Sequence, residues 1–190
     1  MEIVLAELVF KDDKLNYRIY NSPYIRKYHS EILQNCQFAH ARWKHLFKGT
    51  AHDSTSSYFL YNVFSLTATS LHFYNIYKEL NGVIKEYNNH KEEPLWLQSW
   101  MNFHKPNEVL KWHDHYWDFH GYISIDPKKT ITEFREYEVV NEIGNIYIGP
   151  CYREHKVNVL EPYEGERITL GYDVSRKANR DDNISLIPIL

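Results

Sequence analysis

Apolar and polar residues alternate in two short segments near the start of the chain, residues 2–10 and 15–20. The polar stretch between them is short enough to form a turn, so the pattern predicts a β-hairpin. Ser22 followed by Pro23 marks the next boundary, because proline is tolerated in the first turn of a helix. We expect that helix to cover residues 25–47.

A stripe of mostly apolar residues at helical spacing identifies the clearest helix. Its members are Phe59, Val63, Leu66, Ser70, Phe73, Tyr77, Leu80, Ile84 and Tyr87. This spacing places the side chains on one face, which is typical of a helix that packs against a sheet. The polar loop at residues 53–57 is expected to supply its N-cap.

Short alternating segments follow one another through the second half of the chain. They cover residues 95–104, 109–115, 121–125, 131–139, 145–149, 156–160, 167–174 and 184–190. Many short strands separated by turns indicate a β-sandwich or barrel. We therefore expect one mainly β domain with flanking helices over residues 1–190. Residues 1–90 would form a hairpin and helices that support the sheet, and residues 91–190 would form the β core.

Three histidines stand at positions where strands can bring them together. His113 and His115 are two residues apart in one predicted strand, so their side chains point to the same face. His155 lies near the start of another strand. Three protein ligands leave positions open on a metal, which is the arrangement of a reactive site rather than a closed structural one.

An arginine in a later strand adds a possible anion site. Arg167 and Thr169 share one face of that strand, whereas Ile168 and Leu170 share the other. A guanidinium group binds a carboxylate through two parallel hydrogen bonds. A metal together with an anchored carboxylate indicates a small organic acid as cosubstrate.

The same alternation assigns the residues around the histidine pair to faces. Leu110 and Trp112 lie opposite the histidines, where we expect them to pack under the long helix. The aromatic residues near the pair suggest the wall of a substrate pocket. They are Trp112, Tyr116, Trp117 and Phe119.

Composition and charge exclude several classes of function. The net charge is −3 and the sequence pI is near 6.4, with no basic stripe that would neutralise a run of phosphates, so general nucleic-acid binding is not expected. No apolar stretch is long enough to span a bilayer, and no signal peptide is recognised. The two cysteines, Cys36 and Cys151, are expected to be reduced thiols in a cytoplasmic protein, or one in the host cytoplasm if phage-encoded.

Several motifs in the C-terminal half, taken in order, resemble those of the iron(II)- and 2-oxoglutarate-dependent oxygenases. They are the Trp-Met-Asn-Phe-His segment at residues 100–104, the His-x-His pair, the Gly-Asn-Ile-Tyr-Ile-Gly-Pro segment at 144–150, the distal histidine in 154–157 and the Glu-Arg-Ile-Thr segment at 166–169. The resemblance covers roughly residues 95–175 and is greatest to a bacterial and phage group that carries a His-x-His pair. It implies a double-stranded β-helix, or jelly-roll, with an N-terminal helical layer.

The resemblance also assigns roles to residues. His113 and His155 would be iron(II) ligands, and His115 falls where most members have a carboxylate. Arg167 would pair with the distal carboxylate of 2-oxoglutarate, assisted by Thr169. Asn102 and His104 would also contact this cosubstrate. The implied reaction is hydroxylation of a substrate with release of succinate and CO2.

The histidine at position 115 leaves alternatives open. The usual triad has two histidines and one carboxylate, so Asp114 or Asp118 would replace His115 if either reached the metal. Three histidines with an open position are also found in zinc hydratases and hydrolases, and in iron dioxygenases that use no 2-oxoglutarate. A non-catalytic jelly-roll binding or assembly protein with a vestigial metal site is another possibility. Arg167 favours the 2-oxoglutarate enzyme, because the others need no buried guanidinium.

The substrate has no motif of its own. Segments that contact substrate in such folds are loops and the N-terminal layer, and here these carry no pattern that specifies a ligand. We expect a small-molecule or peptide substrate and no membrane partner. The sequence does not define an oligomeric state.

Overall fold

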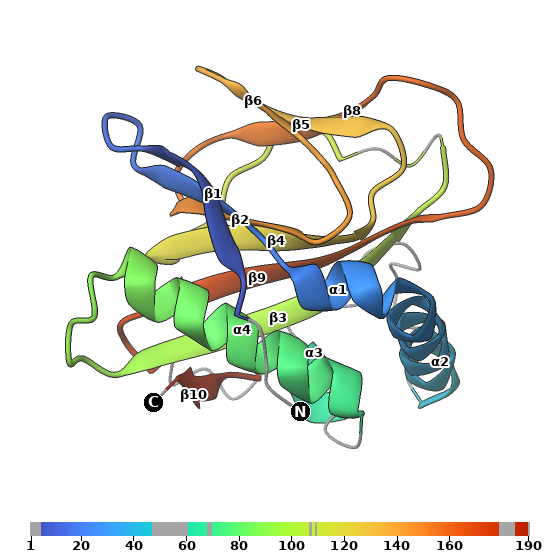
Figure 1. The fold of residues 1–190 in the computed structure, drawn as a ribbon, viewed down its shortest axis with the longest axis horizontal. Helices are drawn as coiled ribbons and strands as arrows, with labels where there is room; N and C mark the ends of the chain where they lie inside the picture. The colour runs from blue at the N-terminus through green and yellow to red at the C-terminus, as the bar shows by residue number, and fades with distance from the viewer. Residues whose placement is uncertain are drawn as a thin grey trace.

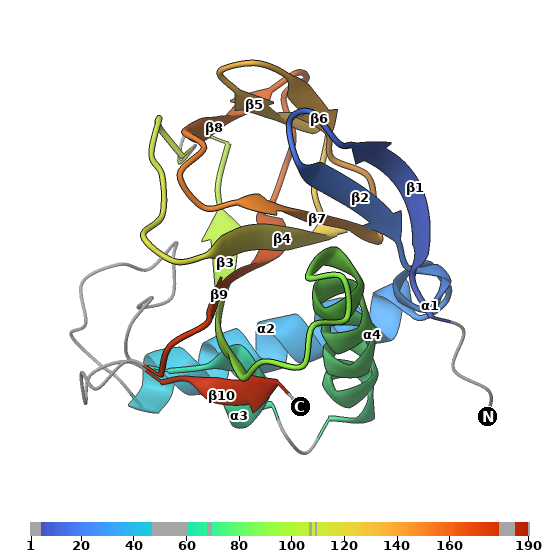
Figure 2. The same ribbon diagram turned by 90° about the vertical axis from the view of Figure 1, so that its left-hand side faces the viewer.

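Two antiparallel sheets face each other, and helices cover the outer face of the larger sheet (Figures 1 and 2). This arrangement is seen in a computed structural model that describes residues 5–46, 61–67, 70–106, 108, 110–178 and 185–189. The mainly β class with flanking helices agrees with the sequence pattern. No helix among the described residues combines the length and the apolar character needed to cross a membrane.

The large sheet runs through the middle of the molecule. Its strands in order are β1 (Glu7–Asp12), β2 (Tyr17–Asn21), β7 (Asn145–Pro150), β4 (Phe119–Asp126), β9 (Arg167–Ser175), β3 (Leu95–His104) and β10 (Ile187–Ile189). The predicted N-terminal hairpin is present as β1 and β2, and β2 pairs with β7. The hairpin therefore extends the sheet. Strand β9 is an inner strand of the sheet, since it pairs with both β3 and β4.

The small sheet has three strands: β6 (Glu138–Val140), β5 (Thr130–Phe134) and β8 (His155–Val159), in that order. The prediction of one strand over residues 131–139 is wrong, because the chain turns between β5 and β6 and the two pair as a hairpin. The predicted strand at 109–115 is not a regular strand in its described part. It contributes a single β-bridge, between His113 and His155.

Both predicted helices are interrupted. The first is divided at Tyr28, which ends α1 (Pro23–Lys27) before α2 (His29–Leu46) begins. The predicted boundary at Ser22-Pro23 is confirmed, and there the Ser22 side chain caps α1. The second is divided into α3 (Val63–Leu66) and α4 (Leu71–Tyr87), and Ser70 caps α4 through its side chain. Residues 53–57 and Phe59 lie outside the described residues.

The main core lies between the helices and the large sheet. The α4 residues Phe73, Leu80 and Ile84 are buried there, which confirms the packing role predicted for the stripe. From the sheet, the core receives Ile168 and Leu170, the apolar face predicted for β9. The opposite face of β9 is thereby directed between the two sheets.

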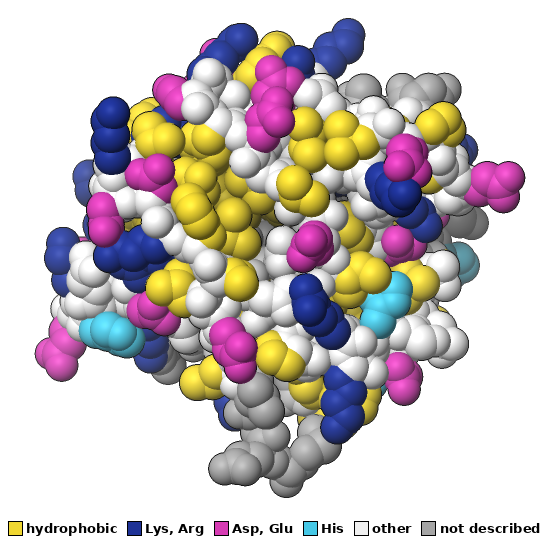
Figure 3. Space-filling view, turned by 45° about the horizontal axis from the view of Figure 1, so that its top comes forward, with side chains coloured by type: hydrophobic (Ala, Val, Ile, Leu, Met, Phe, Trp, Pro, Cys, Tyr) yellow, Lys and Arg dark blue, Asp and Glu magenta, His cyan; other side chains and the backbone are white. Residues whose placement is uncertain are grey.

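Hydrophobic side chains also gather around a hollow on the face shown in Figure 3. A surface pocket between the β1–β2 hairpin and β6 is lined by Leu8, Phe10 and Val140, all exposed.

The register of β1 against β2 shifts between Leu8 and Phe10. Such a bulge twists an edge strand and discourages further strand pairing.

Candidate active site

A cavity of about 240 Å³ lies between the two sheets. It is lined by Trp100, Asn102, Leu110, His113, Asp114, His115, Tyr116, His120, Tyr122, Thr132, His155, Val157, Arg167, Thr169 and Gly171. These residues come from β3, β4, β5, β8, β9 and the segment before β4. The cavity thus contains the three predicted histidines together with Arg167, Thr169 and Asn102.

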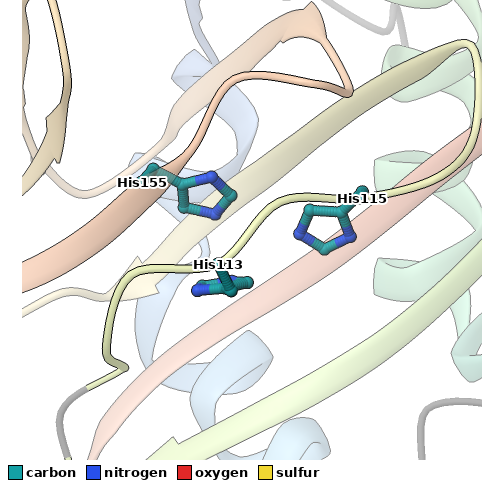
Figure 4. A group of neighbouring side chains, drawn as sticks. All are labelled: His113, His115 and His155. Carbon is teal, nitrogen blue, oxygen red and sulfur yellow. The ribbon is translucent and has the colours of Figure 1, made fainter.

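The three histidines converge from two segments far apart in the sequence (Figure 4). Backbone hydrogen bonds of 3.0 and 2.9 Å join His113 and His155 in both directions, and their ring centroids are 4.3 Å apart. A backbone bond of 3.1 Å from His115 to the Cys151 carbonyl holds the same segment one step further along. One nitrogen from each of the three rings lies within 4.8 Å of the others. The geometry can therefore hold one metal ion.

The second nitrogen of each ring is held by an oxygen. Nδ1 of His113 lies 2.7 Å from the Lys111 carbonyl, and Nδ1 of His155 lies 3.1 Å from the Arg153 carbonyl. Nδ1 of His115 lies 3.1 Å from the Asp173 carboxylate. Carbonyl and carboxylate oxygens only accept hydrogen bonds, so each Nδ1 carries the proton and each Nε2 presents a lone pair. This pattern is typical of metal-ligating histidines.

Burial also keeps two of these rings neutral. It lowers the pKa of His113 and holds the pKa of His155 well below its usual range, where the neighbouring His120 and His113 lower it further. A histidine must be neutral to bind a metal. At neutral pH the rings of His113 and His155 are therefore already in the form that can bind a metal.

Neither nearby aspartate joins the histidine group. Both carboxylate oxygens of Asp118 are bound by Arg176, one by its guanidinium and one by its backbone N–H, at 2.9 and 2.8 Å. Asp114 is exposed and lines the cavity. Among the described residues, the groups with ligand atoms within 4.8 Å of one another include neither aspartate. The geometry favours His115 as the third ligand.

Asp173 and His120 also belong to the site, although sequence analysis did not assign them to it. The carboxylate of Asp173 on β9 is bound by Nδ1 of His115 at 3.1 Å and by Nδ1 of His120 at 2.8 Å. Burial alone would raise the pKa of Asp173, but the attraction to His115 and the hydrogen bonds from both rings outweigh it and lower the pKa. Asp173 lies six positions after Arg167 on the same face, so strand periodicity contained the signal.

Arg167 is a buried cation that lines the cavity, with 3% of its surface exposed. Burial lowers its pKa to about 10, so the guanidinium is still charged at neutral pH. Its described hydrogen-bond partners are neutral: Thr130 Oγ1 and His104 Nδ1, each at 3.4 Å. No carboxylate among the described residues lies within salt-bridge distance of it. A buried charge is normally paired, so this one is suited to an anionic ligand.

The other predicted contacts surround Arg167 in β3 and β9. Asn102 donates to Thr169 Oγ1 at 3.2 Å, and both line the cavity. The amide oxygen of Asn102 is buried with no hydrogen-bond partner in the described structure. His104 is also buried, but it does not line the cavity. Burial and the nearby Arg167 lower its pKa to about 4, so a neutral ring supports the guanidinium from behind.

The faces predicted for the segment before β4 are partly wrong. Leu110 lines the cavity with the histidines, because the segment is not a regular strand and does not alternate. Trp112 packs against Arg135 and Lys156, at 3.7 and 4.8 Å from its ring centroid, and not under the helix. In the predicted aromatic cluster, Tyr116 alone lines the cavity.

Structural comparison identifies the same arrangement of sheets in solved enzymes. The non-heme alpha ketoglutarate dependent carbocyclase SnoK from nogalamycin biosynthesis matches with a TM-score of 0.60 at 9% identity, over 86% of this chain and 83% of that one. The viral collagen prolyl hydroxylase vCPH from Paramecium Bursaria Chlorella virus-1, in its 2OG complex, matches with a TM-score of 0.54 at 10% identity, over 85% and 96%.

A third solved structure, the nickel complex of the non-heme monooxygenase ThoJ, matches with a TM-score of 0.52 at 9% identity, over 85% of this chain and 74% of that one. No protein-family model and no curated protein matches the sequence. At these identities the likeness concerns the fold. The chain therefore has the jelly-roll fold of these enzymes, as the sequence motifs predicted.

Proposed function

We propose that this protein is an iron(II)- and 2-oxoglutarate-dependent oxygenase that hydroxylates its substrate and releases succinate and CO2. The observation that carries the proposal is one cavity with a buried guanidinium at one position and three converging histidines at another. A compound with a carboxylate at one end and a metal-chelating group at the other matches both features. 2-Oxoglutarate has this structure.

The residues of the cavity fit both groups. His113, His115 and His155 would hold the metal through Nε2, and three protein ligands leave the remaining positions open. Bound iron(II) and 2-oxoglutarate would supply the oxidation, in which one oxygen atom of O2 enters succinate and the other enters the substrate.

The protein's own contribution is to bind and orient. Arg167 would bind the distal carboxylate, and Thr169 would orient it from the next position on the same face of β9. The Asn102 amide would hold Thr169 in place, because its N–H already donates to Thr169 Oγ1 at 3.2 Å. Leu110, Trp100 and Val157 provide apolar walls that limit the entry of water.

The size of the cavity limits how a substrate can bind. Sites for drug-sized ligands usually measure roughly 300–1,000 Å³, whereas this cavity measures about 240 Å³. Tyr116 lines it and yet is 94% exposed, so it marks the mouth. We propose a small-molecule or peptide substrate that inserts one group and leaves the rest at the mouth.

The ligand set supports a second candidate, a zinc hydratase or hydrolase. Three histidines without a carboxylate ligand are typical of catalytic zinc, where a bound water becomes the nucleophile. The same ligand set is our reason for proposing that the chain belongs to the His-x-His group of oxygenases. Arg167 separates the two candidates, because a hydratase has no use for a buried guanidinium beside its metal.

Anaerobic titration of iron(II), with and without 2-oxoglutarate, tests the proposal. We expect a weak visible charge-transfer band only when both are present. His155→Ala should abolish the band, because it removes one of three ligands. Arg167→Ala should keep iron bound but weaken 2-oxoglutarate binding by about 3–5 kcal/mol, the usual cost of removing one partner of a buried ion pair.

Asp126→Asn is a suitable control, because Asp126 is paired with Lys128 at the end of β4 and is not part of the described cavity lining. Normal 2-oxoglutarate binding by Arg167→Ala would contradict the assignment of the anion site. Tight zinc binding with no band under any condition would favour the hydratase or hydrolase.

A further inference from the structure

Asp173 occupies a position immediately behind the proposed metal ligands. Its side chain is fully buried, with 0% exposed, and its two oxygens lie 3.1 Å from Nδ1 of His115 and 2.8 Å from Nδ1 of His120. The two imidazole rings are stacked at 3.7 Å with an interplanar angle of 16°. Both histidines line the cavity, whereas Asp173 does not.

The chemistry of these contacts determines the tautomers. An ionised carboxylate has only acceptor atoms, so both Nδ1 atoms must carry protons to bond to it. Nε2 of His115 is then the nitrogen left to ligate. A carboxylate behind a histidine also makes the ring a stronger ligand and fixes its orientation.

The three proposed ligands differ in this respect. Backbone carbonyls of Lys111 and Arg153 hold His113 and His155, and these oxygens carry no net charge. His115 alone of the three is held by a buried carboxylate. His115 also stands where the resembling enzymes have a carboxylate ligand, so here the negative charge lies behind the imidazole ring and not on the ligand itself.

We propose that Asp173 is a positioning residue of this metal centre: it locks His115 in the tautomer that ligates through Nε2 and supplies the negative charge that three neutral ligands lack. His120 is the second donor to the same carboxylate and braces His115 by stacking on it. The proposal rests on the proposed function to the extent that His113, His115 and His155 bind a metal.

A metal could instead bind at a second group of side chains that shares His115 with the first. His115, His120 and Asp173 also form a group whose ligand atoms lie within 4.8 Å of one another, with two histidines and one carboxylate. A metal there would occupy the place of the two hydrogen bonds. It would lie away from the cavity, which Asp173 does not line. The group would also require no contribution from His113 or His155.

Cobalt(II) affinity tests the proposal with a probe that needs no turnover. In Asp173→Asn, the amide offers one acceptor and one donor, so only one of the two Nδ1–H groups retains its bond. We expect cobalt(II) binding to weaken about 10–100-fold, the range for loss of such a supporting partner. His120→Phe keeps an aromatic ring and leaves Asp173 to His115, so it should weaken binding less.

The second readout is nitrogen NMR of the zinc-loaded wild-type protein, which does not depend on any variant folding. We expect His115 to carry a proton on Nδ1 and to bind zinc through Nε2. Ligation through Nδ1 would overturn the proposal. Asp126→Asn, on neighbouring β4, makes the same carboxylate-to-amide change outside the described cavity lining and should leave cobalt affinity unchanged.

Three outcomes separate the hypotheses. If the wild-type protein binds neither cobalt nor zinc, the proposed metal centre itself is wrong. If it binds them and folded Asp173→Asn binds equally well, the role of Asp173 is wrong and the centre stands. If His113→Ala and His155→Ala bind normally while His120→Phe does not, the metal lies on the group formed by His115, His120 and Asp173.

Discussion

Gly171 shows how closely single residues are fitted around the cavity. A Cβ at this position would lie 2.5 Å from ring atoms of Trp100. The Trp100 ring also lines the cavity and stacks near His115 and His120, with centroids 5.9 and 6.4 Å away. Glycine at this point of β9 lets the indole lie flat over the sheet beside the histidines.

Gly171→Ala should therefore both destabilise the protein and disturb metal binding. Overpacking of this kind typically costs about 1–3 kcal/mol, and displacement of Trp100 moves a neighbour of two site histidines. Chemical denaturation and cobalt(II) titration measure the two effects. Gly82→Ala is the matched control, because Gly82 is inside α4 and a Cβ added there would meet no atom within 4 Å. It should stabilise by about 0.5–1 kcal/mol.

The sequence predicted which face of a strand a residue occupies, but not which side chains from other segments lie over that residue. Periodicity placed Arg167 and Thr169 on one side of β9, and the structure agrees. Asp173 follows the same periodicity. Its function depends on which side chains lie between it and the cavity, and those come from His115 and His120, more than fifty residues earlier. No local pattern contains that information.

At the scale of elements, α1 and α4 meet at a buried carboxyl group. Glu79 of α4 accepts a hydrogen bond of 2.5 Å from Ser22, whose hydroxyl also caps α1 by accepting from the Ile25 N–H at 3.0 Å. The other oxygen of Glu79 is buried with no partner in the described structure. Burial raises the pKa of Glu79 to about 7, although the bond from Ser22 opposes the shift.

This contact should make the stability of the protein depend on pH. The folded state holds the Glu79 proton up to about pH 7, whereas an unfolded glutamate loses it near pH 4.3. The stabilising contribution is therefore fully present below about pH 4 and is lost as pH rises to about 7, at up to about 1.4 kcal/mol per unit. Denaturation of Glu79→Gln across this range should lack that slope. An identical slope in both proteins would exclude Glu79 as its cause.

Elements were predicted best where alternation is long and uninterrupted. The bounds predicted for β3, residues 95–104, are those of the structure, because ten residues alternate between two buried faces. The predictions of single helices over residues 25–47 and 59–87 missed the point at which each is divided in two. Tyr28 and Ser70 end or begin helices through backbone geometry and capping bonds. Apolar spacing continues across such points and does not reveal them.

At the scale of the whole molecule, the cavity joins the two sheets. His155 belongs to the small sheet and Arg167 to the large sheet. A metal bound by the first, with an organic acid bound by the second, would cross-link the layers of the sandwich. Binding of the metal and the acid would then stabilise the whole folded protein against unfolding, and not only the residues that contact them.

Thermal unfolding with zinc(II) and 2-oxoglutarate measures this effect. Each ligand at about 100 times its Kd should add about 2.7 kcal/mol, which corresponds to a rise in Tm of about 5–10 °C for a chain of this length. We expect 2-oxoglutarate to raise Tm only when zinc is present, since the acid needs both ends held. A full rise with 2-oxoglutarate alone would show that the anion site works without the metal.

The late position of β9 in the sequence affects the order in which the site can form during synthesis. β9 carries Arg167, Thr169 and Asp173, and side-chain hydrogen bonds join it to residues of β3 and β4 that lie 53 to 72 positions earlier. A chain leaving the ribosome exposes all three histidines before β9 emerges. The nascent chain thus contains the three histidines before it contains Arg167 and Asp173, so the cavity cannot be complete until β9 has been synthesised.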